Sequence, residues 1–196
     1  MVIYTIGHSN HEIERFVELL RVHAIATVVD VRTSPFSKYC PQFDKELLQT
    51  LLARQGIQYV FLGRELGGRP DGDEFYDAAG HALYERMAES ERFRVGIAQL
   101  VADHADGHAA LMCGEEDPAE CHRHLLLARV LDAAGVEVRH IRGSGTVQSY
   151  RAVIEAAKKS ESGVLQLELF PTEETHAWRS TRSVLPRKPP ASSSGP

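Results

Sequence analysis

Short apolar segments alternate with amphipathic segments along most of the chain, and no other feature constrains the fold as strongly. Strands are predicted at residues 2–6, 26–31, 58–62, 109–113 and 136–141. Helices are predicted at 45–55, 118–134 and 149–158, with a further one beginning at Ser9 and one or two within 74–105. Segment 26–31 is nearly continuous in apolar residues, as expected of a parallel strand buried on both faces. The alternation therefore predicts an α/β fold with an open, mainly parallel sheet flanked by helices.

The length and composition fit one domain followed by a tail. The chain has 196 residues, of which 43% are hydrophobic and 25% charged, and these are ordinary values for a globular protein. We expect residues 1–160 to form the α/β domain and the Pro-, Ser- and Arg-rich segment 171–196 to be disordered. No apolar run reaches the roughly 18 residues that cross a bilayer. The start predicts a strand rather than a signal peptide, so no membrane partner is expected.

The net charge argues against a non-specific DNA-binding protein, and the number of cysteines argues against a disulfide-rich one. The net charge is −5, but segment 171–196 carries four basic and two acidic side chains, so the rest of the chain is close to −7. Such a body lacks the broad basic surface of a non-specific DNA-binding protein, and a nucleic-acid role needs a local basic site. Three cysteines do not suggest a disulfide framework, so we expect reduced thiols and a cytoplasmic location.

Polar side chains follow the predicted strands at the points where they end. They are His8 and its neighbour Ser9, Asp30, Arg32, Arg64, Arg69, Cys113, Glu115 and Arg142. The carboxyl ends of parallel strands meet at one edge of a sheet, which is the usual ligand site of such folds. Loops are polar in any case, but the number of arginines and histidines favours a real site at this edge.

The densest group of reactive residues is Cys113-x-Glu115-x5-Cys121-His122-Arg123. A helix that begins here favours a thiolate at Cys121 and anion binding by Arg123. Cys113, Cys121 and His122, with Cys40 as an additional candidate, are also possible zinc ligands, but they lack the usual Cys-x2-Cys pairing, so we expect no metal. The plain alternative is that the cysteines are small buried residues.

Glu115 is the preferred chemical group of this segment. A carboxylate beside a helix start can act as general acid, as general base or as a stabiliser of an oxocarbenium-like centre. Asp30 is either its partner in glycosidic chemistry or a residue that fixes Arg32. Glu115 is alternatively a solvated or capping carboxylate, and His8 is either a proton or phosphate contact or an ordinary loop histidine.

Two loops have a composition that suits nucleotides. Segment 63–70 carries three glycines with Arg64 and Arg69, which favours phosphate binding over a plain turn. Segment 34–43 mixes aromatic and basic residues, so Lys38 is expected near backbone phosphate and Tyr39 on a base. The second loop is equally explained by aromatic residues that pin it to the core.

Four motifs together resemble a known prokaryotic family. They are Thr5–Ser9, Val29–Arg32 followed by Ser34-Pro, Leu62–Gly68 and Cys113–Arg123. In this order, over about residues 1–160, the chain is identified as a member of the domain of unknown function 488 family. The resemblance implies a Rossmann-like α/β domain, and it suggests nucleotide or nucleic-acid processing, including N-glycosidic cleavage.

Residues 161–170 contain a candidate partner site. Gln166-Leu167-Glu-Leu169-Phe170 is similar to the short peptides with which bacterial replication and repair proteins bind the DNA sliding clamp. The alternating leucines equally predict an edge strand. If the peptide binds the clamp, tethering raises the local concentration on DNA without a basic surface.

The leading hypothesis is a DNA- or nucleotide-processing enzyme that hydrolyses the N-glycosidic bond of a damaged or modified base without a cofactor. Its carboxylates are Glu115 and Asp30, and its proton or phosphate partners are His8 and His122. Its anion contacts are Arg32, Arg64, Arg69, Arg123 and Arg142. Two other hypotheses stay open: a thiol- or metal-dependent enzyme that uses Cys113, Cys121 and His122, and a non-catalytic module that binds a nucleotide.

Overall fold

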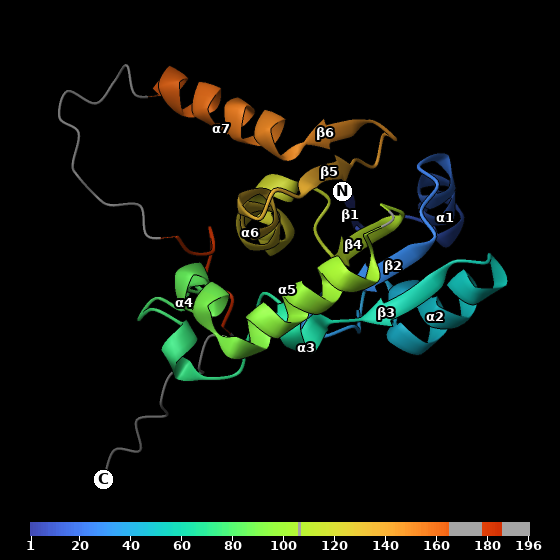
Figure 1. Ribbon diagram of the computed structural model, residues 1–196, viewed down its shortest axis with the longest axis horizontal. Coiled ribbons are helices and arrows are strands. Elements are labelled where there is room, and N and C mark those ends of the chain that lie inside the picture. Colours follow the sequence, from blue (N-terminus) through green and yellow to red (C-terminus); the bar gives the residue numbers. More distant parts are fainter. Residues whose placement is uncertain (106, 165–177, 186–196) are drawn as a thin grey trace, which may run out of the picture.

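The computed structural model describes residues 1–105, 107–164 and 178–185 and has the predicted α/β architecture (Figure 1). Its sheet has the strand order β3-β2-β4-β1-β5-β6. The strands are β1 (Val2–Gly7), β2 (Thr27–Asp30), β3 (Gln58–Phe61), β4 (Ala109–Cys113), β5 (Glu137–Ile141) and β6 (Val147–Ser149). The first five run parallel to their neighbours, and β6 pairs antiparallel with β5. The carboxyl ends of β1, β2 and β4 therefore lie side by side.

Helices cover both faces of this sheet. The α-helices are α1 (Ile13–Val22), α2 (Lys45–Arg54), α3 (Gly63–Leu66), α4 (Tyr84–Glu89), α5 (Glu91–Asp103), α6 (Arg129–Ala133) and α7 (Tyr150–Val164). The other helical turns are η1 (Pro41–Phe43), η2 (Asp73–Phe75), η3 (Pro118–Glu120) and the π-helical turn η4 (Arg123–Ala128). In Figure 1, α1 and α2 lie on one side of the sheet, and α3, α5 and α6 lie on the other.

The two faces bury different residues of the same strands, because successive side chains of a strand point in opposite directions. Val28 and Met112 belong to the core under α1 and α2, whereas Val29 and Leu111 belong to the core under α3–α6. All four residues of β2 are buried. This explains why segment 26–31 is nearly continuous in apolar residues.

Several local features differ from the sequence prediction. α1 begins at Ile13, whereas Ser9 has a positive φ of 47° and lies in the turn after β1. The segment after β5 forms the short strand β6, which no apolar pattern predicted. The helix predicted at 118–134 is divided into η3, η4 and α6. None of the helices described here is long and apolar enough to cross a membrane.

Part of the range expected to be disordered is packed on the domain. The Trp178 indole Nε1 donates a 2.6 Å hydrogen bond to the carbonyl oxygen of Leu125, and the Arg129 guanidinium lies 4.3 Å above the Trp178 ring. The Ser180 amide donates to the carbonyl oxygen of Ala82. An aromatic anchor and backbone pairing therefore fix segment 178–185. The predicted clamp peptide at 166–170 lies outside the described residues.

Candidate functional site

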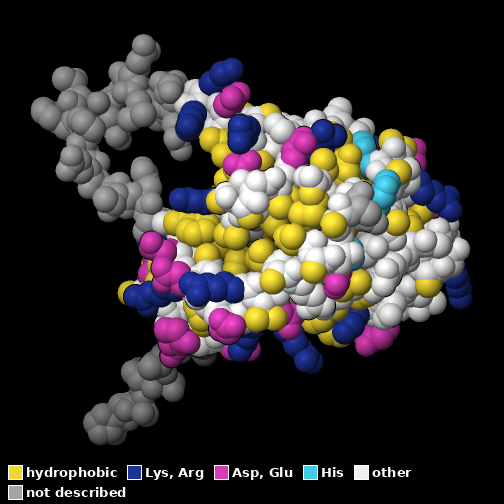
Figure 2. Space-filling view, viewed as in Figure 1, with side chains coloured by type: hydrophobic (Ala, Val, Ile, Leu, Met, Phe, Trp, Pro, Cys, Tyr) yellow, Lys and Arg dark blue, Asp and Glu magenta, His cyan; other side chains and the backbone are white. Residues whose placement is uncertain are grey.

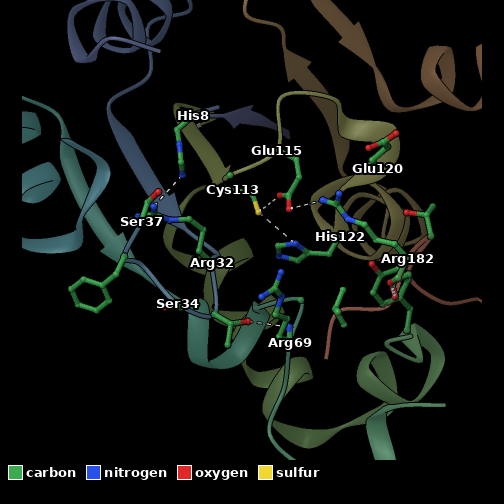
Figure 3. Close-up of a pocket in the computed structure, with 18 residues that line it drawn as sticks. His8, Arg32, Ser34, Ser37, Arg69, Cys113, Glu115, Glu120, His122 and Arg182 are labelled. Carbon is green, nitrogen blue, oxygen red and sulfur yellow. Dashed lines mark hydrogen bonds and ion pairs between the residues drawn. The ribbon is translucent and has the colours of Figure 1, made fainter. Parts of the chain in front are cut away.

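A polar cavity of about 430 Å³ opens where β1, β2 and β4 end (Figure 3). This is the edge at which a parallel sheet usually binds its ligand, because loops from several strands converge there. The cavity is lined by His8, Arg32, Thr33, Ser34, Phe36, Ser37, Gly68, Arg69, Tyr84, Cys113, Gly114, Glu115, Glu120, His122, Ser180, Thr181, Arg182 and Val184. The structure thus brings together six of the predicted site residues: His8, Arg32, Arg69, Cys113, Glu115 and His122.

Two thiols, a carboxylate and an imidazole form a compact cluster in the cavity wall. The Cys113 Sγ lies 3.0 Å, and the Cys121 Sγ 3.3 Å, from Oε2 of Glu115. The same sulfurs lie 3.6 Å and 3.7 Å from Nδ1 of His122. Cys113 ends β4, whereas Cys121 and His122 immediately precede the π-helical turn η4. Such turns are frequent at functional sites.

A backbone contact fixes the orientation of the His122 ring. Its Nε2 lies 3.1 Å from the carbonyl oxygen of Val31, which only accepts hydrogen bonds, so Nε2 carries the proton. Nδ1 then faces the two sulfurs. Burial alone would lower the pKa of His122, but the contact with Cys121 and the charge of Glu115 raise it. A Cβ on Gly68 would lie only 2.7 Å from the His122 ring, so a glycine is needed for the close packing of the loop.

Glu115 is ionised at neutral pH. Burial alone would raise the pKa of Glu115, but the hydrogen bond from the Cys113 thiol and further donors, including the Cys121 thiol, lower it to about 2. The guanidinium of Arg182 lies 3.6 Å from Oε1 of Glu115 and adds positive charge beside it. The cavity therefore holds a negative carboxylate whose neighbours donate to it.

His8 is neutral at pH 7, and both of its ring nitrogens form hydrogen bonds with neighbouring residues. Burial and then the charge of Arg32 lower the pKa of His8 to about 4. Its Nε2 accepts from Nη1 of Arg32 at 3.1 Å, its Nδ1 donates to the carbonyl oxygen of Ser9 at 2.9 Å, and its ring stacks on Phe43. Nε2 of His8 thus accepts a hydrogen bond from Arg32, and His8 is not a general acid at neutral pH.

Asp30 does not line the cavity and does not face Glu115 across it. It is fully buried, and its carboxylate accepts from Nη2 of Arg32 at 2.6 Å and from the Tyr59 hydroxyl at 2.7 Å. Nη2 of Arg32 also donates to the carbonyl oxygen of Phe43 at 2.8 Å. The structure therefore favours the second sequence interpretation, in which Asp30 fixes Arg32, and it corrects the pairing of Asp30 with Glu115.

Arg123 and Arg142 shape the site from outside the cavity. Arg123 is fully buried, and its guanidinium donates to the carbonyl oxygens of Glu115 and Glu116 at 3.0 Å and 2.6 Å. Arg142 forms an ion pair with the Glu116 carboxylate at 2.8 Å. Both arginines hold the loop that carries Glu115, which corrects their predicted role as direct anion contacts.

The other predicted residues lie away from the cavity. The hydroxyl of Ser9 donates to its neighbour Asn10, and Lys38 and Tyr39 are exposed on the loop before η1, where Tyr39 is 88% exposed. Arg64 lies on α3 and lines a separate hollow beside α5. Phe36 and Ser37, which precede Lys38 on the same loop, line the cavity instead.

Sequence reasoning missed the wall that segment 178–185 supplies. Ser180, Thr181, Arg182 and Val184 line the cavity about 60 residues after the motif at 113–123. The only local signal in this polar tail is Trp178, the single tryptophan of the chain. Tyr84 and Glu120 were also missed, because neither falls at the end of a strand.

The sheet topology and this cavity define an α/β protein with an open, mainly parallel sheet and a polar site at the carboxyl edge of its parallel strands. Residues 12–130 match the family described as domain of unknown function DUF488, so the chain belongs to that family, as its motifs predicted. No curated protein and no solved structure gives a significant match. The matched range includes Glu115 and the cysteine–histidine cluster but not His8 or segment 178–185.

Proposed function

We propose that this protein is a hydrolase that acts on a nucleotide, or on one nucleotide unit of a nucleic acid. The most concrete form of the proposal is hydrolysis of the N-glycosidic bond of a damaged or modified base. The observation that carries it is the ionised Glu115 carboxylate in a cavity that Arg69 and Arg182 also line. Guanidinium groups suit the phosphate of such a substrate.

The size of the cavity supports a small substrate or a single extruded nucleotide. Its volume of about 430 Å³ is in the range of small-molecule sites, not of a groove that holds a duplex. In Figure 2, positive and negative side chains are mixed over the visible face instead of forming one basic surface. Nucleic-acid recognition would therefore depend on the arginines of the cavity.

One carboxylate is sufficient for the proposed reaction. The bond between the sugar C1′ and the base nitrogen breaks, and its electron pair leaves with the base. The negative charge of Glu115 stabilises the oxocarbenium-like sugar and orients the water that adds to C1′. The water proton passes by way of Glu115 and solvent to the departing base, so the products are the free base and the hydrolysed sugar. Asp30 has no part in these steps.

The test is incubation with oligonucleotides and free nucleotides that carry a panel of modified bases, scored for released base and for abasic sites. Glu115→Gln keeps the shape of the side chain but removes its charge, and we expect at least about 100-fold slower turnover. Glu120→Gln is the matched control, because it neutralises another carboxylate of the same cavity and should retain most of the activity. No product with any substrate, or equal rates for parent and Glu115→Gln, would contradict the proposal.

Binding of Gln166–Phe170 to the DNA sliding clamp stays a prediction from the sequence. It would bring the cavity close to DNA despite the acidic body. The proposed chemistry does not require it.

A further inference from the structure

The cluster in the cavity wall has the donor atoms of a transition-metal site. The Cys113 Sγ, Cys121 Sγ and one ring nitrogen of His122 all lie within 4.8 Å of one another, and all three residues are buried. Two thiolates and one imidazole form a set that zinc prefers, and the same set occurs in catalytic zinc sites that keep a fourth position open. Oxygen-preferring ions such as Mg²⁺ are not suited to it.

The distances agree with tetrahedral coordination. With zinc bonds of about 2.3 Å to sulfur and about 2.0 Å to nitrogen, a sulfur and a nitrogen ligand are about 3.5 Å apart. In this structure the two sulfurs lie 3.6 Å and 3.7 Å from Nδ1 of His122. With these two distances, and with the two sulfurs within 4.8 Å of each other, one ion can contact all three atoms.

The surroundings of His122 are those of a metal ligand. Metal-bound histidines usually donate their second ring N–H to a carbonyl or carboxylate, which fixes the ring. Nε2 of His122 makes this contact with the carbonyl oxygen of Val31 at 3.1 Å. Nδ1 is thereby turned toward the sulfurs.

The fold explains how these residues can bind zinc although they lack the usual Cys-x2-Cys pairing. A Cys-x2-Cys pair is needed where one short turn must present both thiols. Here Cys113 comes from the end of β4, and Cys121 comes from the helix start that follows a closed loop. Arg123 fixes that loop through the carbonyl oxygens of Glu115 and Glu116, so the two cysteines at its ends lie close to each other.

We propose that Cys113, Cys121 and His122 bind one Zn²⁺ ion, with the fourth coordination position directed into the cavity. Cys113 and His122 line the cavity, so this position is open to a water or a substrate atom (Figure 3). Glu115, 3.0 Å and 3.3 Å from the ligand sulfurs, lies beside the ion rather than among its three ligands. The proposal does not depend on which bond the enzyme hydrolyses.

The test is metal binding by the reduced full-length protein. Protein purified without chelator is analysed for zinc, then stripped, and titrated with Zn²⁺ in competition with a chromophoric chelator. We expect one Zn²⁺ per chain, and with Co²⁺ the intense near-ultraviolet absorption of thiolate–cobalt bonds. Cys121→Ser and His122→Ala should each weaken binding at least about 100-fold.

Two variants serve as controls. Cys40→Ser removes a thiol of similar burial that bonds to Ser9 and lies outside the cluster, and it should bind Zn²⁺ like the parent. Glu115→Gln should also retain the ion, so loss of turnover in that variant with metal still bound separates the two proposals. A folded parent that does not compete with the chelator, or a Cys121→Ser variant that binds as tightly as the parent, would overturn the metal site.

Discussion

Asp30 shows how a residue's role depends on its immediate partners. Its carboxylate accepts from the backbone N–H of Arg32, from the Arg32 guanidinium and from Tyr59, and it is fully buried. Arg32 in turn donates to His8, which faces the cavity. Asp30 is therefore a positioning residue, and its effect on the site passes through Arg32 and His8.

Replacing Asp30 by Ala should destabilise the protein strongly. The substitution leaves the guanidinium of Arg32 buried without its counter-charge, and breaking such a pair costs about 3–5 kcal/mol. The free energy of unfolding in urea measures the effect. Glu137→Ala is the control, because it removes the carboxylate of an exposed ion pair with Arg139 and should cost less than about 1 kcal/mol. Similar losses for both variants would refute the assigned role.

Segment 178–185 is part of the site although no pattern in the sequence predicts a helix or a strand there. Its Arg182 contacts Glu115, and its Ser180 pairs with Ala82 just before α4. The segment is held by the Trp178 side chain, by a few backbone hydrogen bonds and by the ion pair between Arg179 and Asp77. Because these contacts are few, we expect the segment to detach locally without unfolding of the sheet. The cavity is complete only when this segment is attached.

Ser180→Pro should detach this segment without unfolding the domain. Proline removes the amide hydrogen that bonds to the carbonyl oxygen of Ala82, and Ser180 is buried. Because Trp178 is the only tryptophan, its emission should shift to longer wavelength, close to that of the unfolded chain, while far-ultraviolet circular dichroism stays unchanged. Thr181→Ala, at an exposed neighbouring position, should give the parent spectrum. An unshifted emission in Ser180→Pro would show that the Ala82 contact does not hold the segment.

At the scale of the whole molecule, a buried polar chain links β1, β5 and the helix after β4. Arg123 donates to the Thr5 hydroxyl at 3.0 Å, Thr5 pairs with Nδ1 of His140 at 2.7 Å, and Nε2 of His140 lies 3.0 Å from Nδ1 of His124. Burial, followed by the neighbouring His124 and Arg123, lowers the pKa of His140 to about 2. The fold therefore requires a neutral His140.

This requirement predicts loss of stability in mild acid. The unfolded chain takes up a proton at His140 as the pH falls through about 6.5, whereas the folded protein does not, so protons favour the unfolded state below that pH. His140 should contribute about 1 kcal/mol per pH unit to the fall in the free energy of unfolding between about pH 6 and pH 4.5. Urea unfolding at several pH values should give a shallower slope for His140→Gln. Parallel curves for parent and variant would disprove the contribution.

The sequence by itself determined the α/β class, the succession of β1 to β5 along the chain and the edge at which the polar residues meet. These follow from local periodicity and from strand ends, which are properties of neighbouring residues. Only the tertiary structure decided that Asp30 pairs with Arg32, that Arg123 is a buried support and that segment 178–185 closes the cavity. It also brought Cys113, Cys121 and His122 to ligand distances. Side-chain partners between distant segments depend on packing in three dimensions, which local patterns do not specify.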